Sequence, residues 1–67
     1  MRIPRIFTAQ PLIIGSSIQL EEGAARHLSS ALRMSVGQSI ILFDGRGGEY
    51  SAALTEVKKG KVWVAVN

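Results

Sequence analysis

Two arginines and a histidine in one short amphipathic segment are the residues best suited to bind an anion. Arg26 and Arg33 are seven residues apart, so in a regular α-helix they lie within roughly 20° of each other on one face. His27 lies at the border of this face. The other face of the predicted helix is apolar and consists of Ala24, Ala25, Leu28, Ala31 and Leu32. One face is therefore suited to a core, and the other could bind a phosphate through charge-assisted hydrogen bonds.

Three further arginines lie outside this segment. Arg2 and Arg5 form a basic N-terminal arm that could hold phosphates. Arg46 is surrounded by Gly45, Gly47 and Gly48, where backbone N–H groups could approach an anion.

These cations also have simpler interpretations. Arg33 near a helix C-terminus complements the helix dipole, and Arg2 and Arg5 protect an edge strand from pairing with other chains. The remaining cations, Lys58, Lys59 and Lys61, are typical of a solvated hairpin tip, and we expect at most a secondary electrostatic role for them.

About five short strands and one helix must position these residues. The expected strands are residues 2–8, 17–20, 39–43, 49–57 and 62–66, bounded by turn signals such as Asp44-Gly45. Pro4 cannot donate to a sheet ladder, so the first strand is predicted at an edge, and the last three strands should form a meander. Glu21 and Glu22 open the helix, where carboxylates complement its positive end. The predicted fold is mainly β with one helix (α+β), arranged as a small, partly open β-barrel.

The aromatic residues are assigned mostly to the core. Phe7, Phe43 and Tyr50 are expected to pack inside. Trp63 alternates with the valines of the last strand and so faces the other way. It either stacks on a base or covers the junction with another domain, and we favour the second interpretation.

Composition limits the classes of function. The chain has 67 residues, one histidine, no cysteine and a net charge of +3. Disulfides and thiolate metal sites are excluded, the single histidine leaves no metal cluster, and a reducing cytosolic location is expected. No apolar run approaches the ~20 residues of a membrane span, and the N-terminus lacks the apolar region of a signal peptide. Positive charge permits nucleic acid as a partner.

Four sequence segments together resemble the N-terminal domain of the RsmE family. They are MRIPRIF at 1–7, HLSSALRM at 27–34, GQSIILFDG at 37–45 and EYSAAL at 49–54, in the family's order and spacing. Members of this family are S-adenosylmethionine-dependent methyltransferases that modify N3 of a uridine in small-subunit ribosomal RNA.

The resemblance implies a PUA-like β-barrel that grips RNA, followed in the parent protein by a knotted SPOUT-type domain that holds S-adenosylmethionine and most of a homodimer interface. Residues 1–67 would then be one RNA-binding domain of a cytoplasmic enzyme of rRNA processing and ribosome biogenesis. This segment itself is expected to have no catalytic residue, cofactor or metal site, and no membrane contact. The residues assigned to RNA binding are Arg2, Arg5, Arg26, His27, Arg33 and Arg46.

Two other interpretations remain open. The chain could be a free-standing module that binds ribosomes or RNA with the same basic face. It could instead dock or dimerise with a neighbour and contact no RNA, which an exposed Trp63 and an unpaired terminal strand would suit.

Overall fold

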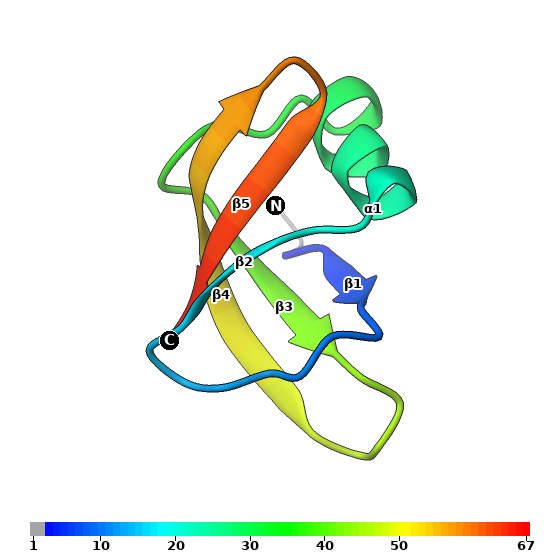
Figure 1. The fold of residues 1–67 in the computed structure, drawn as a ribbon. Helices are drawn as coiled ribbons and strands as arrows, with labels where there is room; N and C mark the ends of the chain where they lie inside the picture. The colour runs from blue at the N-terminus through cyan, green and yellow to red at the C-terminus, as the bar shows by residue number, and fades with distance from the viewer. Residues whose placement is uncertain (1–2) are drawn as a thin grey trace.

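Three antiparallel strands form the centre of the fold. The computed structural model describes residues 3–67, in which β3 (Ser39–Phe43), β4 (Glu49–Lys58) and β5 (Lys61–Val66) follow one another as a meander. The short strands β1 (Arg5–Phe7) and β2 (Ser17–Gln19) complete a sheet of order β1-β3-β4-β5-β2 (Figure 1). The predicted mainly β fold with five strands and one helix is confirmed.

The edges of the sheet are formed by its two shortest strands. As predicted, β1 is an edge strand, and it pairs with β3 in parallel, with Ile6 opposite Leu42. The strand β2 pairs antiparallel with β5, with Ile18 opposite Val64. The predicted basic residue Arg2 lies outside the described residues.

Period-two alternation places the core on one face of the sheet. In β5, Val62, Val64 and Val66 are buried while Trp63 is only half-buried, as the sequence predicted. The buried side chains come from nearly every element: Ile6, Leu12, Leu20, Ala25, Leu28, Ile40, Leu42, Ala52, Leu54, Val62, Val64 and Val66. This core holds the helix against β5.

The helix differs from the regular one that the sequence predicts. It consists of α1 (Glu22–Arg26) followed directly by a π-helical turn η1 (His27–Ala31), in which the N–H of Leu32 donates to the His27 carbonyl at 3.0 Å. A π-helical turn contains more residues than the 3.6 of an α-helical turn, so the α-helical spacing of side chains no longer applies after His27. Ala25 and Leu28 are buried as expected, but the prediction that Ala31 and Leu32 face the core is wrong, because both are exposed.

The same irregularity corrects the predicted basic face. Arg33 lies beyond the helix, with a left-handed φ of 51°. The chain reverses there, and the N–H of Met34 donates to the Leu28 carbonyl at 2.9 Å. Arg26 and Arg33 therefore do not lie on one helical face.

Among the aromatic residues, Phe7 departs from the prediction. Its side chain is 54% exposed because Ile6, its neighbour in β1, points into the core and successive side chains of a strand point to opposite faces. Phe7 packs edge-to-face on Phe43, with the ring centroids 5.8 Å apart. Phe43 and Tyr50 are partly buried.

The carboxylate of Glu21 joins the start of the helix to the segment after β1. Glu21 is the N-cap residue, but its side chain makes no capping hydrogen bond. Instead it accepts hydrogen bonds of 2.9 Å from the buried Thr8 hydroxyl and from the Ala9 N–H. Partial burial raises the pKa of Glu21, but the N–H groups of Ala9 and of Glu21 itself, with the side chains of Thr8 and Gln10, outweigh it and lower the pKa below its usual value.

Loss of this carboxylate is expected to destabilise the domain in a pH-dependent way. Because the folded-state pKa is lowered, the contribution is complete above the unfolded pKa of about 4.3 and disappears as the pH falls through the lower folded value. Glu21→Gln should lose roughly 1 kcal/mol at pH 7, measured by urea unfolding. At pH 3 the gap from wild type should narrow. Glu56→Gln, on an exposed part of β4, is the control; a gap that stayed constant with pH would contradict the assignment.

Candidate nucleic-acid interface

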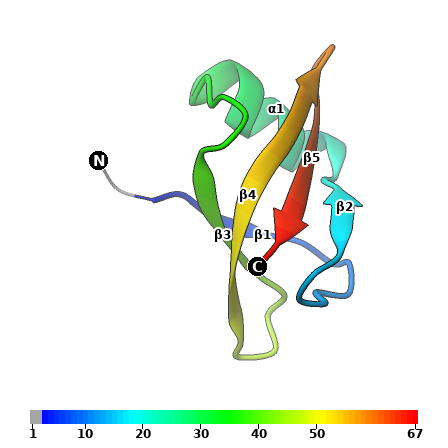
Figure 2. The same ribbon diagram turned by 90° about the vertical axis from the view of Figure 1, so that its left-hand side faces the viewer.

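A basic cavity lies between the helix and the β4–β5 turn. Three cations, Arg26, Lys59 and Lys61, and one carboxylate, Glu22, line about 320 Å³ together with Ser29, Ser30 and Gly60. Figures 1 and 2 both show the helix and the β4–β5 turn at the same end of the molecule. Positive charge therefore gathers where a helix and a hairpin tip approach each other.

The cations of this end are only weakly neutralised. Arg26 donates to Glu22 at 3.1 Å in an (i, i+4) pair, with both side chains more than 70% exposed, so solvent screens the pair strongly. No ion pair joins Lys58, Lys59 or Lys61 to a carboxylate among residues 3–67. These charges remain available to an external anion.

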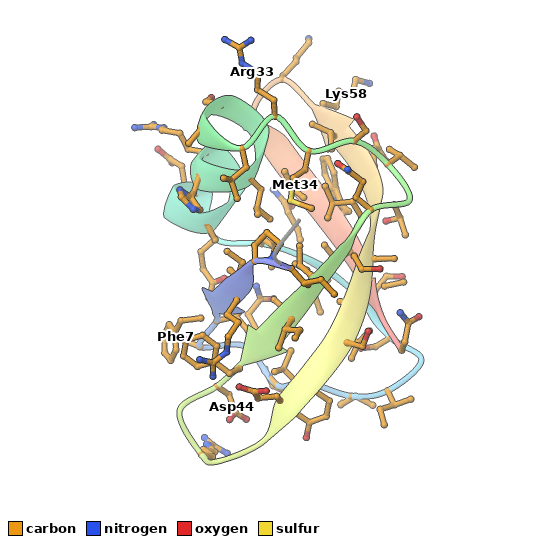
Figure 3. The ribbon with its side chains drawn as sticks, turned by 180° about the vertical axis from the view of Figure 1, so that it is seen from behind. Phe7, Arg33, Met34, Asp44 and Lys58 are labelled. Carbon is orange, nitrogen blue, oxygen red and sulfur yellow. The ribbon has the colours of Figure 1, made fainter. Side chains whose placement is uncertain are left out.

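Arg33 projects from the same end of the molecule. Figure 3 shows the labelled side chains of Arg33 and Lys58 together at this end, with Asp44 at the opposite end. The left-handed backbone at Arg33 turns the chain out of the helix and carries the guanidinium into solvent.

His27 lines a second, apolar groove and not the cavity of Arg26. His27 and Arg5 lie on this groove with Ile3, Pro4, Leu32 and Ile41. Arg5 forms an ion pair with Glu49, and its guanidinium carbon lies 5.1 Å from the centroid of the Phe43 ring. The charge of Arg5 is thus already matched by a carboxylate and an aromatic face.

Arg46 lies in the β3–β4 loop. Its backbone N–H donates to Asp44 Oδ1 at 2.9 Å, an Asx turn that gives Asp44 the turn-fixing role predicted for it. Since the Asp44 and Arg33 ends are opposite in Figure 3, the loop of Arg46 lies far from the basic cavity.

Within residues 3–67 no group of three or more His, Cys, Asp or Glu side chains could hold a metal ion. No helix of the described part is long and apolar enough to cross a membrane.

Comparison with known proteins identifies the fold. A family model of the RNA methyltransferase PUA domain matches residues 20–67. The chain belongs to this family.

Solved structures similar to this PUA domain agree with the match to the family model. A Legionella pneumophila protein assigned as a methyltransferase, solved with the cofactor SAM bound, is 32% identical, with a TM-score of 0.94 over 98% of this chain. The ribosomal RNA small subunit methyltransferase E of Neisseria gonorrhoeae, bound to S-adenosylmethionine, is 31% identical, with a TM-score of 0.90 over 97% of this chain. A probable rRNA methyltransferase of Porphyromonas gingivalis is 26% identical, with a TM-score of 0.81 over 97% of this chain.

The PUA domain is similar to only part of each of these proteins. It spans 27% of the Legionella and Neisseria chains and 26% of the Porphyromonas chain. The resemblance to the RsmE family is confirmed.

The structure divides the predicted RNA-binding residues of the PUA domain among three places. Arg26 and Arg33 belong to the basic end, His27 and Arg5 to the apolar groove, and Arg46 to the far loop. Sequence reasoning gave little weight to Lys59 and Lys61, which the fold brings to Arg26. The available signal was the cluster of three lysines around this turn, although nothing in the sequence placed the turn beside the helix.

Proposed function

We propose that this PUA domain binds RNA and positions ribosomal RNA for an S-adenosylmethionine-dependent methyltransferase domain in a longer protein. The observation that carries the proposal is the match of residues 20–67 to the RNA methyltransferase PUA domain. The basic cavity supports it, because phosphate contacts by lysine and arginine orient a protein on nucleic acid without reading sequence.

The substrate we propose is small-subunit ribosomal RNA, with N3 of a uridine as the methylated atom. The support is similarity to the Neisseria small-subunit methyltransferase. We further propose that the longer protein is a homodimer acting in ribosome biogenesis in the cytoplasm. These finer statements rest on the resemblance of the sequence to the RsmE family.

The role of the domain in this mechanism is positional. Cations of the basic end hold the phosphate backbone while the target base leaves its stack and enters the catalytic domain. The described residues supply charge and shape for binding, and the methyl donor belongs to the other domain. Removal of the PUA domain should therefore weaken RNA binding more than binding of S-adenosylmethionine.

The 67-residue chain is expected to bind a ribosomal RNA fragment weakly and in a salt-dependent manner. Each phosphate contact to a single strand contributes about −0.7 to the slope of log K against log salt, so three to four contacts give roughly −2 to −3. Fluorescence anisotropy at several salt concentrations between about 50 and 200 mM measures this slope.

Absence of binding at the lowest salt would contradict the proposal. It would favour the interpretation as a docking domain, for which the groove of Ile3, Leu32 and Ile41 offers an apolar surface. Binding with a slope near zero would equally contradict a phosphate-directed mode.

A further inference from the structure

We infer that the cavity between the helix and the β4–β5 turn is a binding site for one phosphate group of the RNA backbone, with Lys59 and Lys61 as its main ligands. The inference rests on the proposed function and adds residues that sequence reasoning treated as a solvated tip. Three local features of this cavity are unfavourable without an anion.

The first feature is a like-charge pair across the hairpin. Lys58 and Lys61 occupy directly opposed register positions in β4 and β5. Like charges at such positions repel each other, and a hairpin that only had to fold would place an uncharged or opposite-charge pair there. Neither lysine has a carboxylate partner among the residues that the structure describes. An anion bound nearby would remove the repulsion.

The second feature is the backbone of the turn itself. Lys59 and Gly60 form a two-residue connection, with φ values of 52° and 79°. Hairpin turns with two left-handed residues favour asparagine or aspartate followed by glycine, because a positive φ is strained for most other side chains. The lysine at position 59 therefore places a cation on the cavity at the cost of a strained backbone conformation.

The third feature is the hydroxyl of Ser29. Its Oγ is buried and has no hydrogen-bond partner among residues 3–67, although Ser29 and Ser30 line the same cavity. A buried hydroxyl without a partner is costly, and a phosphate oxygen is a suitable acceptor.

These features agree on the charge of the ligand. Three cations against the single carboxylate Glu22 select an anion, and hydroxyl and ammonium donors suit phosphate oxygens. The cavity has charged and hydroxyl-bearing lining residues and lies at the end where Arg33 also projects, so a chain of phosphates could continue from it along the surface. Departures from local rules that cluster at one site are typical of function.

The decisive experiment compares Lys59→Asn and Lys61→Gln with the wild-type chain. Asparagine suits the left-handed position, so Lys59→Asn should raise the melting temperature by roughly 4 °C. The same substitution should weaken RNA binding by about fivefold to tenfold and reduce the salt slope by roughly one contact. A stability gain with an affinity loss cannot come from misfolding.

Removal of the Glu22 carboxylate, which competes for Arg26, is expected to raise the affinity for RNA. Glu22→Gln should strengthen RNA binding by about threefold at 100 mM salt, because Arg26 is then freed from its ion pair. Glu49→Gln is the matched control, since Glu49 also pairs with an arginine but lies away from the cavity. An equal gain in both variants would show a general charge effect and overturn the inference.

Failure of the inference is distinguishable from failure of the proposed function. If wild type binds RNA and both lysine variants bind equally well, the cavity is not a phosphate site and the proposed function stands. If wild type binds no RNA at low salt, the proposed function falls and the inference with it. Binding to anionic lipid vesicles but not to RNA would also overturn both.

Discussion

Replacement of Leu28 by alanine is expected to destabilise the domain more than any substitution at its surface. Leu28 is fully buried. Of the residues of η1, Leu28 is the one whose side chain enters the core beneath β5. Leucine-to-alanine changes at such sites cost about 2–5 kcal/mol through lost burial and the cavity left behind. A domain of this length has only about 3–10 kcal/mol of stability in total, so Leu28→Ala should leave a partly unfolded population.

The measurement is thermal or urea unfolding followed by circular dichroism. The midpoint of the variant should fall by more than about 10 °C. Leu32→Ala is the matched control, four positions along the same segment, with 43% of its leucine exposed. It should cost less than about 1 kcal/mol, since most of its surface keeps contact with water. Equal losses in the two variants would mean that the helix continues in regular α-helical phase and buries both leucines.

The strands could be predicted from the sequence because their signals are local. Alternation in Val62–Val66 and the apolar run Ser39–Phe43 set which side chains enter the core, and Asp44 marked the turn between strands. The parallel pairing of β1 with β3 has no comparable local signal, because it joins segments more than thirty residues apart. Pairing partners at that separation are chosen by the collapse of the whole core.

The helix shows where a periodic pattern becomes misleading. A period of 3.6 residues predicts that Leu28 and Leu32 share one face of the helix and that Arg26 and Arg33 share the other. The π-turn His27–Ala31 breaks that period. Nothing in the segment HLSSA distinguishes a π-turn from an α-turn by composition alone. The burial of Leu28 beneath β5 and the reversal at Arg33 depend on contacts that form only in the folded chain.

The site was only partly predictable for a similar reason. The sequence singled out Arg26 as a candidate for anion binding, but the sequence alone did not bring Lys59 and Lys61 beside it. Conversely, the sequence presents Arg5 as a free cation, but the fold places it in an ion pair with Glu49, which lies across β3. The fold brings some charges that are far apart in the chain into one cluster and places others in ion pairs. A count of cations in the sequence therefore does not show which of them remain unpaired.

Reversal of charge at the basic end is the largest effect we expect on RNA binding. Arg26→Glu together with Arg33→Glu replaces two cations by two carboxylates in exposed positions, the first on the cavity with Lys59 and the second at the same end of the molecule. Each lost charge-assisted contact costs about tenfold in affinity, so the double variant should bind a ribosomal RNA fragment on the order of 100-fold more weakly. The fold should persist, because neither side chain is part of the core.

The matched variants separate charge from shape and one end of the molecule from the other. Arg26→Lys with Arg33→Lys keeps both charges and should lose less than about threefold, because phosphate contacts of this kind are mainly electrostatic. Arg46→Glu reverses a charge in the β3–β4 loop, near Asp44 at the opposite end, and should lose far less than the double variant. A larger loss at Arg46 than at Arg26 and Arg33 would place the RNA on the glycine-rich loop. In that case the free lysines of the β4–β5 turn would have to be explained by something other than a nucleic-acid phosphate.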